Sequence, residues 1–164
     1  MIRLSRLADY AVLLMSRMAN APDRVHNAID IAEATGLPAP TVSKLLATLA
    51  REGLLKSVRG AKGGYGLASP SHEITVANII AAIDGPIAIT YCIEHGPGSC
   101  DVENLCPSRV GWQAINRAVQ QALEGVTLAE ISTGPLPSQF AALPTQLAVA
   151  PEGDSAVKAG QSIA

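Results

Sequence analysis

The sequence predicts a mostly α fold, a winged helix-turn-helix with a long C-terminal dimerisation helix. Hydrophobic residues make up 48% of the 164 residues but aromatic residues only 3%, and a core of aliphatic side chains suits packed helices better than a β-sandwich. Apolar residues recur every three or four positions in several segments, which is the spacing of a helix with one buried face. A strand, turn and strand pattern follows the third of these helices, where a wing is expected.

Three helices are predicted before the wing. They span residues 5–20, 27–34 and 41–52. The inward stripe of the first helix is Leu7, Tyr10, Ala11, Leu14 and Met18, and that of the third is Val42, Leu45, Leu46 and Leu49. Residues 21–23 end the first helix, and Gly53 ends the third as a C-cap residue. Because a tight turn at residues 36–38 joins the second and third helices, the two form a helix-turn-helix candidate.

The segment after Gly53 predicts a β-hairpin. Residues 54–59 and 65–68 have the pattern of strands, and the glycine-rich residues between them have that of a turn. A hairpin directly after a helix-turn-helix is a wing, and its tip would carry Arg59 and Lys62. A fourth helix is predicted at residues 75–83.

The C-terminal half predicts a loop, a long helix and a short final helix. Residues 87–107 form the loop and residues 108–123 the long helix, whose apolar stripe is Trp112, Ile115, Val119 and Ala122. This stripe either packs on its own domain or forms a dimer interface, and we favour the interface because the helix lies outside the first domain. Thr127 and Glu130 have the capping-box spacing that opens a short helix.

Charge is distributed unevenly along the chain. Residues 1–70 carry nine lysines and arginines against five acids, and residues 71–164 carry three against nine. This asymmetry favours a polyanion as partner of the first part, although a solvated surface would give the same count. The apolar run 10–15 is too short for a signal peptide, and prolines interrupt the uncharged stretch 131–151. We therefore expect a cytoplasmic protein with no membrane partner.

The third predicted helix carries residues suited to reading DNA. The second helix of such a motif enters the major groove by its N-terminal end, where Thr41, Ser43 and Lys44 would meet base edges. Pro38 and Pro40 would contact sugars or thymine methyl groups. The predicted phosphate contacts are Arg51, Arg59 and Lys62. The alternative is a helical hairpin that packs against protein, but the wing and the local positive charge favour double-stranded DNA.

Three cysteines, Cys92, Cys100 and Cys106, lie within fifteen residues of a loop rich in glycine and proline. Thiolates suit iron-sulfur clusters or zinc, and a reducing compartment disfavours a disulfide framework. A metal or cluster is our preferred interpretation; a thiol redox switch and inert cysteines are the alternatives. No CxxC pair is present, which disfavours a zinc ribbon. Nearby candidates for a fourth ligand are His95, Asp101 and Glu103.

Several motifs together are similar to one family of winged-helix regulators. They are Arg3-Leu-Ser, Asp9-Tyr-Ala-Val, Gly53-Leu-Leu, Ser57-Val-Arg-Gly, Gly63-Gly-Tyr, Ile83-Asp-Gly, the three cysteines and Thr127-Leu-Ala-Glu. The family contains the iron-sulfur cluster regulator, the nitric-oxide-sensing repressor and the rhizobial iron regulator. The resemblance covers roughly residues 1–132, and the opening most resembles the branch that regulates the Suf iron-sulfur assembly genes.

The resemblance implies a homodimer with crossing C-terminal helices, a palindromic operator, and Cys92, Cys100 and Cys106 as ligands of an iron-sulfur cluster. A 2Fe-2S cluster is favoured and a 4Fe-4S cluster is possible. Arg109 stands where the cluster regulator has a histidine ligand. The nitric-oxide-sensing branch uses an aspartate from the first helix of the other subunit, and Asp9 matches that position. An N-terminal-turn acid favoured by the helix dipole is the alternative role of Asp9.

We therefore expect four parts: a winged-helix DNA-binding domain at 1–84, a cluster loop at 85–107, a dimerisation helix and short final helix at 108–132, and a disordered tail at 133–164. The expected function is an iron-sulfur-dependent repressor of Suf-type genes. A nitric-oxide- or iron-responsive repressor, and a thiol redox or zinc-containing regulator, are the alternatives. An enzyme is disfavoured because His95 and the cysteines lie near no oxyanion or phosphate motif.

Overall fold

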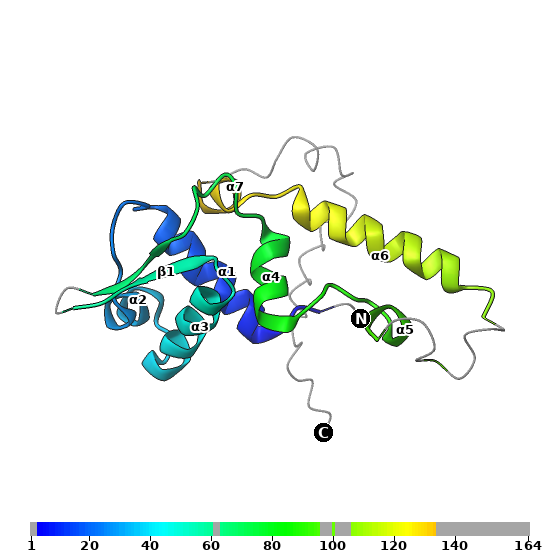
Figure 1. Cartoon of the computed structure of the whole chain (residues 1–164), viewed down its shortest axis with the longest axis horizontal. Helices are drawn as coiled ribbons and strands as arrows, with labels where there is room; N and C mark the ends of the chain where they lie inside the picture. Colours follow the sequence, from blue (N-terminus) through cyan, green and yellow to red (C-terminus); the bar gives the residue numbers. More distant parts are fainter. Residues whose placement is uncertain (1–2, 61–62, 96–99, 101–105, 134–164) are drawn as a thin grey trace, which may run out of the picture.

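The computed structural model describes residues 3–60, 63–95, 100 and 106–133. Its elements are α1 (Arg6–Ala19), α2 (Ala28–Thr35), α3 (Ala39–Arg51), β1 (Leu55–Val58), β2 (Gly64–Leu67), α4 (Val76–Asp84), α5 (Tyr91–Glu94), α6 (Arg109–Glu124) and α7 (Leu128–Thr133). In Figure 1, α1–α4, α7 and the hairpin gather into one body, and α6 extends away from it. The predicted disordered tail lies outside the described residues apart from its first residue, Thr133.

The main core lies between α1, α2, α3 and the hairpin. Its fully buried side chains include Leu14, Met15 and Met18 of α1 and Leu46 and Leu49 of α3. Leu14, Met18, Leu46 and Leu49 belong to the predicted inward stripes, which are confirmed at these positions. Met15 was not predicted to face inward, and Leu7, which was, is 43% exposed. The mostly helical body with one small sheet agrees with a winged helix.

Local capping explains where the first two helices begin and end. The Ser5 hydroxyl accepts a hydrogen bond from the Ala8 amide at 3.0 Å, and the Asn27 side chain accepts one from the Asp30 amide at 2.8 Å. Both bonds satisfy amides that the first helical turn leaves without a partner. Gly36 ends α2 with φ 70°, a conformation that favours glycine.

The third helix begins earlier than predicted. It starts at Ala39, with Pro38 as its N-cap and Pro40 inside its first turn, whereas the sequence pattern suggests a start at residue 41. A proline in the first helical turn costs no hydrogen bond, because the amides there have no partner within the helix. Thr41 and Lys44 therefore lie within the first two turns of α3.

The hairpin is antiparallel, with Leu55 opposite Leu67 and Val58 opposite Gly64. A single bridge adds the linker between α1 and α2 to its edge: the His26 amide donates to the Tyr65 carbonyl, and the Tyr65 amide donates to the His26 carbonyl, both at 2.8 Å. The wing is therefore attached to the helical body at its base.

The final helix packs back onto the body. Leu128 is fully buried in the main core, its amide donates to the Ile74 carbonyl at 2.7 Å, and the Val76 amide donates to the Val126 carbonyl at 2.9 Å. The predicted capping box is confirmed, because the Glu130 carboxylate accepts from the Thr127 amide at 2.8 Å. That backbone hydrogen bond, together with the one from the Thr127 hydroxyl, lowers the pKa of Glu130.

Within the part of the chain that the structure describes, no helix combines the length and the apolar character needed to cross a membrane.

Candidate nucleic-acid interface and metal centre

The outward face of α3 presents most of the residues predicted to read DNA. Val42, Leu45 and Leu49 fill the core, so the opposite face of α3 is turned to solvent. Ser43 and Lys44 are exposed on that face. The two prolines, Pro38 and Pro40, are also exposed, and Thr41 is half-buried. The helix therefore offers hydroxyl, ammonium and apolar groups near its N-terminal end, which is the mixture that base edges and sugars require.

One side of α3 borders a groove shared with α1 and α4. The groove has a volume of about 530 Å³, and its lining residues are Leu7, Pro40, Thr41, Lys44, Leu45, Thr48, Arg51, Ala82 and Ile83. Thr41, Lys44 and Arg51 therefore lie on the groove side of α3, whereas Ser43 is not among its lining residues. Arg51 also forms an exposed ion pair with Glu52, with 3.3 Å between Nε and Oε1.

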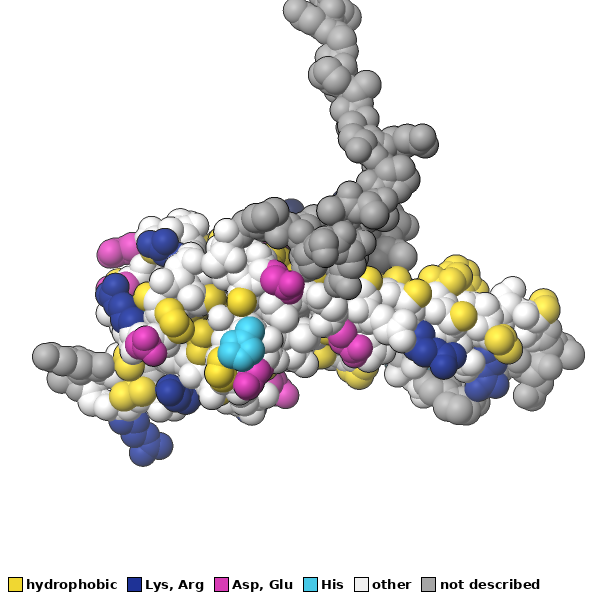
Figure 2. Space-filling view, turned by 90° about the horizontal axis from the view of Figure 1, so that it is seen from above, with side chains coloured by type: hydrophobic (Ala, Val, Ile, Leu, Met, Phe, Trp, Pro, Cys, Tyr) yellow, Lys and Arg dark blue, Asp and Glu magenta, His cyan; other side chains and the backbone are white. Residues whose placement is uncertain are grey.

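The wing contributes Arg59, which is exposed directly after β1. Lys62 lies outside the described residues. Lys56 of β1 is a further exposed cation of the wing, which the sequence interpretation did not place among the DNA contacts. Figure 2 shows lysine and arginine side chains on the end of the molecule that carries the helix-turn-helix and the wing, with acidic side chains among them.

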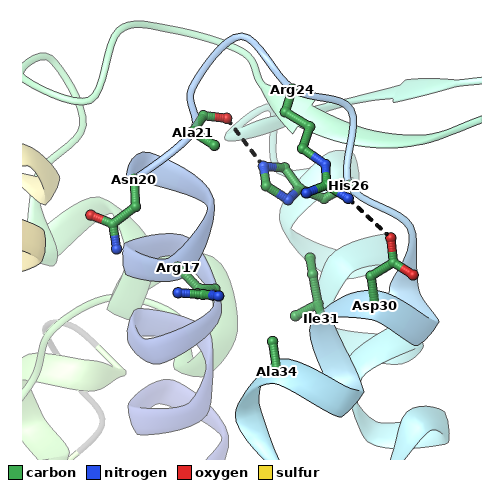
Figure 3. A pocket seen from close by; sticks show the side chains of 8 residues that line it. All are labelled: Arg17, Asn20, Ala21, Arg24, His26, Asp30, Ile31 and Ala34. Atoms are coloured by element: carbon green, nitrogen blue, oxygen red, sulfur yellow. Dashed lines mark hydrogen bonds and ion pairs between the residues drawn. The ribbon is translucent and has the colours of Figure 1, made fainter.

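A polar pocket of about 250 Å³ lies between the end of α1 and α2, behind the base of the wing (Figure 3). His26 is only 8% exposed, and its Nε2 lies 3.2 Å from the Ala21 carbonyl oxygen. Arg24, in the linker between α1 and α2, forms an ion pair with Asp30 of α2, with 3.3 Å between Nη2 and Oδ2. These contacts fix the linker that forms the bridge to Tyr65, so they help to set the orientation of the wing.

The predicted cysteine loop contains a single helical turn, α5, and in this respect the expectation of a continuous loop at 87–107 was wrong. The Glu94 and His95 amides donate to the carbonyls of Thr90 and Tyr91 at 3.1 and 3.0 Å. The rings of Tyr91 and His95 stack with centroids 4.1 Å apart. Cys92 lies on this turn, and its Sγ is 3.4 Å from the Thr90 hydroxyl oxygen.

The three cysteines are free thiols, and each is half-buried. Among residues 3–60, 63–95, 100 and 106–133, no group of three or more histidine, cysteine or acidic side chains is close enough to hold a metal ion. Asp101 and Glu103, two candidates for a fourth ligand, lie outside these residues. His95 is described, with its Nδ1 3.2 Å from the Tyr91 carbonyl oxygen.

Asp9 is exposed on the outer face of α1. Solvent therefore stabilises its charge, so the acid needs no protein partner within its own chain. Its match to a ligand supplied by a second subunit remains a prediction.

The long helix α6 has two different faces. Trp112 and Ile115 are exposed to 42% and 47%, whereas Val119 and Leu123 are half-buried toward the rest of the chain. The buried residue of α6 is Asn116, whose side chain bonds to the backbone at Ile87 and Ile89. Sequence reasoning missed Asn116; the signal was a polar residue four positions after Trp112 and three before Val119, within a stripe of helical spacing.

A helix-turn-helix formed by α2 and α3, followed by an attached hairpin, has the architecture of the winged-helix class of DNA-binding regulators. Residues 4–134 match the Rrf2 family, described as an iron-dependent transcriptional regulator. The chain belongs to the Rrf2 family, whose members are transcriptional regulators and not enzymes. This confirms the family indicated by the sequence motifs.

Relatives and solved structures agree with this assignment. A putative HTH-type transcriptional regulator, Rv1287 of Mycobacterium tuberculosis, is 35% identical over 87% of this chain and 88% of its own length. The HTH-type transcriptional regulator IscR of Vibrio parahaemolyticus is 30% identical over 80% of this chain and 78% of its own. The structure of CymR, the global cysteine regulator of B. subtilis, matches with a TM-score of 0.64 and 27% identity, covering 80% of this chain and 97% of that one.

Proposed function

We propose that this chain is an iron-sulfur-dependent transcriptional repressor that binds a palindromic operator as a homodimer and controls Suf-type iron-sulfur assembly genes. The observation that carries the proposal is the set of three free, half-buried thiols that follows a winged helix with an exposed recognition helix. The similarity to a regulator named IscR supports the same proposal.

The donor set fits an iron-sulfur cluster in its chemistry. Cys92, Cys100 and Cys106 supply soft sulfur ligands, and Asp9 of a second copy is the proposed fourth. The described residues of a single chain do not bring these groups together, so the site would be completed by rearrangement of the cysteine segment and by the second chain. A bound cluster, 2Fe-2S in preference to 4Fe-4S, would supply sensitivity to redox state or to iron supply. In the proposed mechanism, cluster state changes the spacing of the two recognition helices.

A second copy is proposed to cover the exposed face of α6. Val110, Trp112 and Ile115 are exposed to 76%, 42% and 47% on a helix that extends away from the body. Large apolar side chains on an outlying helix favour burial against a partner. A symmetric dimer would place two copies of α3 to read the two halves of a palindrome.

The proposed contacts to DNA follow from the positions of the side chains. Thr41, Ser43 and Lys44 would contact base edges. Pro38 and Pro40 would contact sugars or thymine methyl groups. Arg51, Arg59 and Lys62 would contact phosphates, where they add affinity and little sequence information.

The experiment that tests the proposal starts from anaerobic purification, followed by iron and sulfide analysis. A duplex selected by the protein from a random-sequence library then serves as probe in fluorescence anisotropy, with cluster-loaded and cluster-free protein. Iron and sulfide in the protein, together with a palindromic selected site whose affinity depends on the cluster, would support the proposal. Colourless protein with one zinc per chain would contradict it in favour of the zinc alternative.

A thiol redox regulator is the second candidate, favoured by the presence of three free cysteines without a bond between them. The similarity to the oxidised form of Staphylococcus aureus CymR, whose structure is 27% identical to this chain, supports this candidate. Reversible loss of DNA binding on oxidation of iron-free protein would favour this candidate over the cluster.

A further inference from the structure

Asn116 is only 8% exposed, although most other residues of α6 are exposed. A buried amide is stable only when its polar atoms are bonded. Here both ends of the amide are used: Nδ2 donates to the Ile87 carbonyl at 3.0 Å, and Oδ1 accepts from the Ile89 amide at 3.0 Å. Asn116 thus holds two backbone groups, two residues apart, on the segment between α4 and α5.

This segment leads directly to Cys92. Ile89 is followed by Thr90, the extended N-cap of α5, and the Thr90 hydroxyl oxygen lies 3.4 Å from the Cys92 sulfur. Only two residues therefore separate the backbone held by Asn116 from the cysteine itself. The two hydrogen bonds therefore attach α6 to the backbone just before Cys92.

The other end of the segment is fixed to the DNA-binding body. The Gly85 amide donates to the Ala81 carbonyl at the end of α4, and the Ser5 hydroxyl donates to Asp84 Oδ1 at 2.7 Å. Ser5 is also the N-cap of α1. The segment therefore connects α1 and α4 at one end with α6 and Cys92 at the other.

A pocket of about 200 Å³ that opens to solvent lies beside this segment. Its lining is partly apolar, with Ile80, Ile87 and Val119, and partly charged, with Arg3, Asp84 and Glu94. Apolar packing therefore covers only part of the segment, and the two hydrogen bonds from Asn116 add to its attachment.

We infer that Asn116 is a positioning residue that ties Cys92 to α6, so that a change at the thiol site reaches the helix proposed to form the dimer. The inference rests on the proposed function of Cys92 as a cluster ligand. An asparagine suits the role because one short side chain supplies both a donor and an acceptor. Leucine has a similar size and supplies neither, and ionised aspartate supplies only the acceptor.

The test compares Asn116→Leu and Asn116→Asp with the wild type and with Gln113→Leu, a matched change at an exposed position of the same helix. Two rates are measured on iron-free, reduced protein. One is hydrogen exchange of the Ile89 amide, and the other is alkylation of each cysteine by iodoacetamide, resolved by peptide mass spectrometry. Circular dichroism checks that each variant is folded.

In Asn116→Leu, exchange at Ile89 should rise about tenfold, the scale of one lost hydrogen bond. Alkylation of Cys92 should rise several-fold, while the rate at Cys106 stays unchanged. Asn116→Asp should keep Ile89 protected and give Cys92 a rate between those of the wild type and the leucine variant. Gln113→Leu should match the wild type. A purely structural role would raise all three cysteine rates together.

Wild-type rates at Cys92 in Asn116→Leu would overturn the inference. If that variant does not fold, a wild-type Cys92 rate in Asn116→Asp would overturn it. Reconstitution with iron and sulfide separates this result from the proposed function: the visible absorption of a loaded cluster should decay faster in Asn116→Leu than in Gln113→Leu. A wild-type protein that takes up no cluster would refute the proposed cofactor, and the alkylation rates would still decide the role of Asn116.

Discussion

Replacing Gly64 with alanine should detach the base of the wing. A Cβ at Gly64 would lie 2.3 Å from the His26 carbonyl oxygen and 2.8 Å from the carbonyl carbon, both of them backbone atoms. Neither can move without opening the bridge between His26 and Tyr65, whose two hydrogen bonds are 2.8 Å long. The φ angle of Gly64 is not positive, so the cost of the substitution is steric.

The magnitude follows from the bonds that must open. Two backbone hydrogen bonds contribute about 1 kcal/mol each to the free energy of unfolding, so Gly64→Ala should lower it by about 2 kcal/mol. Gly66→Ala is the matched control on the same strand. Its Cβ would approach the flexible end of the Lys56 side chain at 3.3 Å, and its cost should stay within about 0.5 kcal/mol.

Urea denaturation followed by circular dichroism measures both variants, at one protein concentration because the stability of the proposed dimer would depend on it. Hydrogen exchange at the Tyr65 amide should accelerate in Gly64→Ala and remain slow in Gly66→Ala. Equal midpoints for the two variants would refute the steric argument. So would a protected Tyr65 amide in Gly64→Ala.

Three further outcomes are expected. Leu128→Ala should lower the free energy of unfolding by about 3 kcal/mol, because it opens a cavity where the side chain is fully buried. Ile131→Ala, at a position 37% exposed, is the control on the same helix. Equal losses for the two variants would show that α7 is not part of the core. Because the pKa of Glu130 is lowered in the folded protein, its capping bonds stabilise the fold above the unfolded glutamate pKa, about 4.3. This contribution is lost as pH falls through the lower pKa of the folded state. Acid titration of Glu130→Gln should lack that step, and an unchanged titration would contradict the assignment. Arg59→Ala should weaken binding to all duplexes alike. It should also reduce the slope of log affinity against log salt by about one, the value for a single phosphate neutralised by a cation. A loss of affinity confined to duplexes altered at one base position would instead indicate that Arg59 reads a base.

The helices of the DNA-binding body could be predicted because their signals are local. Leu14, Met18, Leu46 and Leu49 recur at helical spacing, so the pattern of the sequence itself marks the buried face. The packing of α7 could not be predicted in this way. Leu128 reaches a core whose other members lie between Ala11 and Ile79, and no periodicity encodes which distant surface a short helix will meet.

The inward face of α6 could not be predicted from apolar spacing. The predicted stripe of Trp112, Ile115, Val119 and Ala122 was assigned to a dimer interface, and its residues are exposed except for Val119, which is half-buried. The face turned to the chain is centred on a polar residue, Asn116, with Val119 and Leu123 beside it. Only the backbone groups at 87 and 89, which lie far away in sequence, show why an amide belongs there.

The two faces of α6 connect two features that the sequence predicted separately, the cysteine segment and the dimer interface. One face holds the segment that ends in Cys92, and the adjacent face presents Trp112 and Ile115 for the proposed second copy. A change in the position of Cys92 would therefore act on the same helix that, in the proposed dimer, would set the distance between the two DNA-binding bodies. The proposed coupling between Cys92 and DNA binding therefore requires no long chain of contacts. The helix α6 carries both the face that holds the Cys92 segment and the face proposed to meet the second copy. At its other end the same segment is joined to α1 by the hydrogen bond between Ser5 and Asp84.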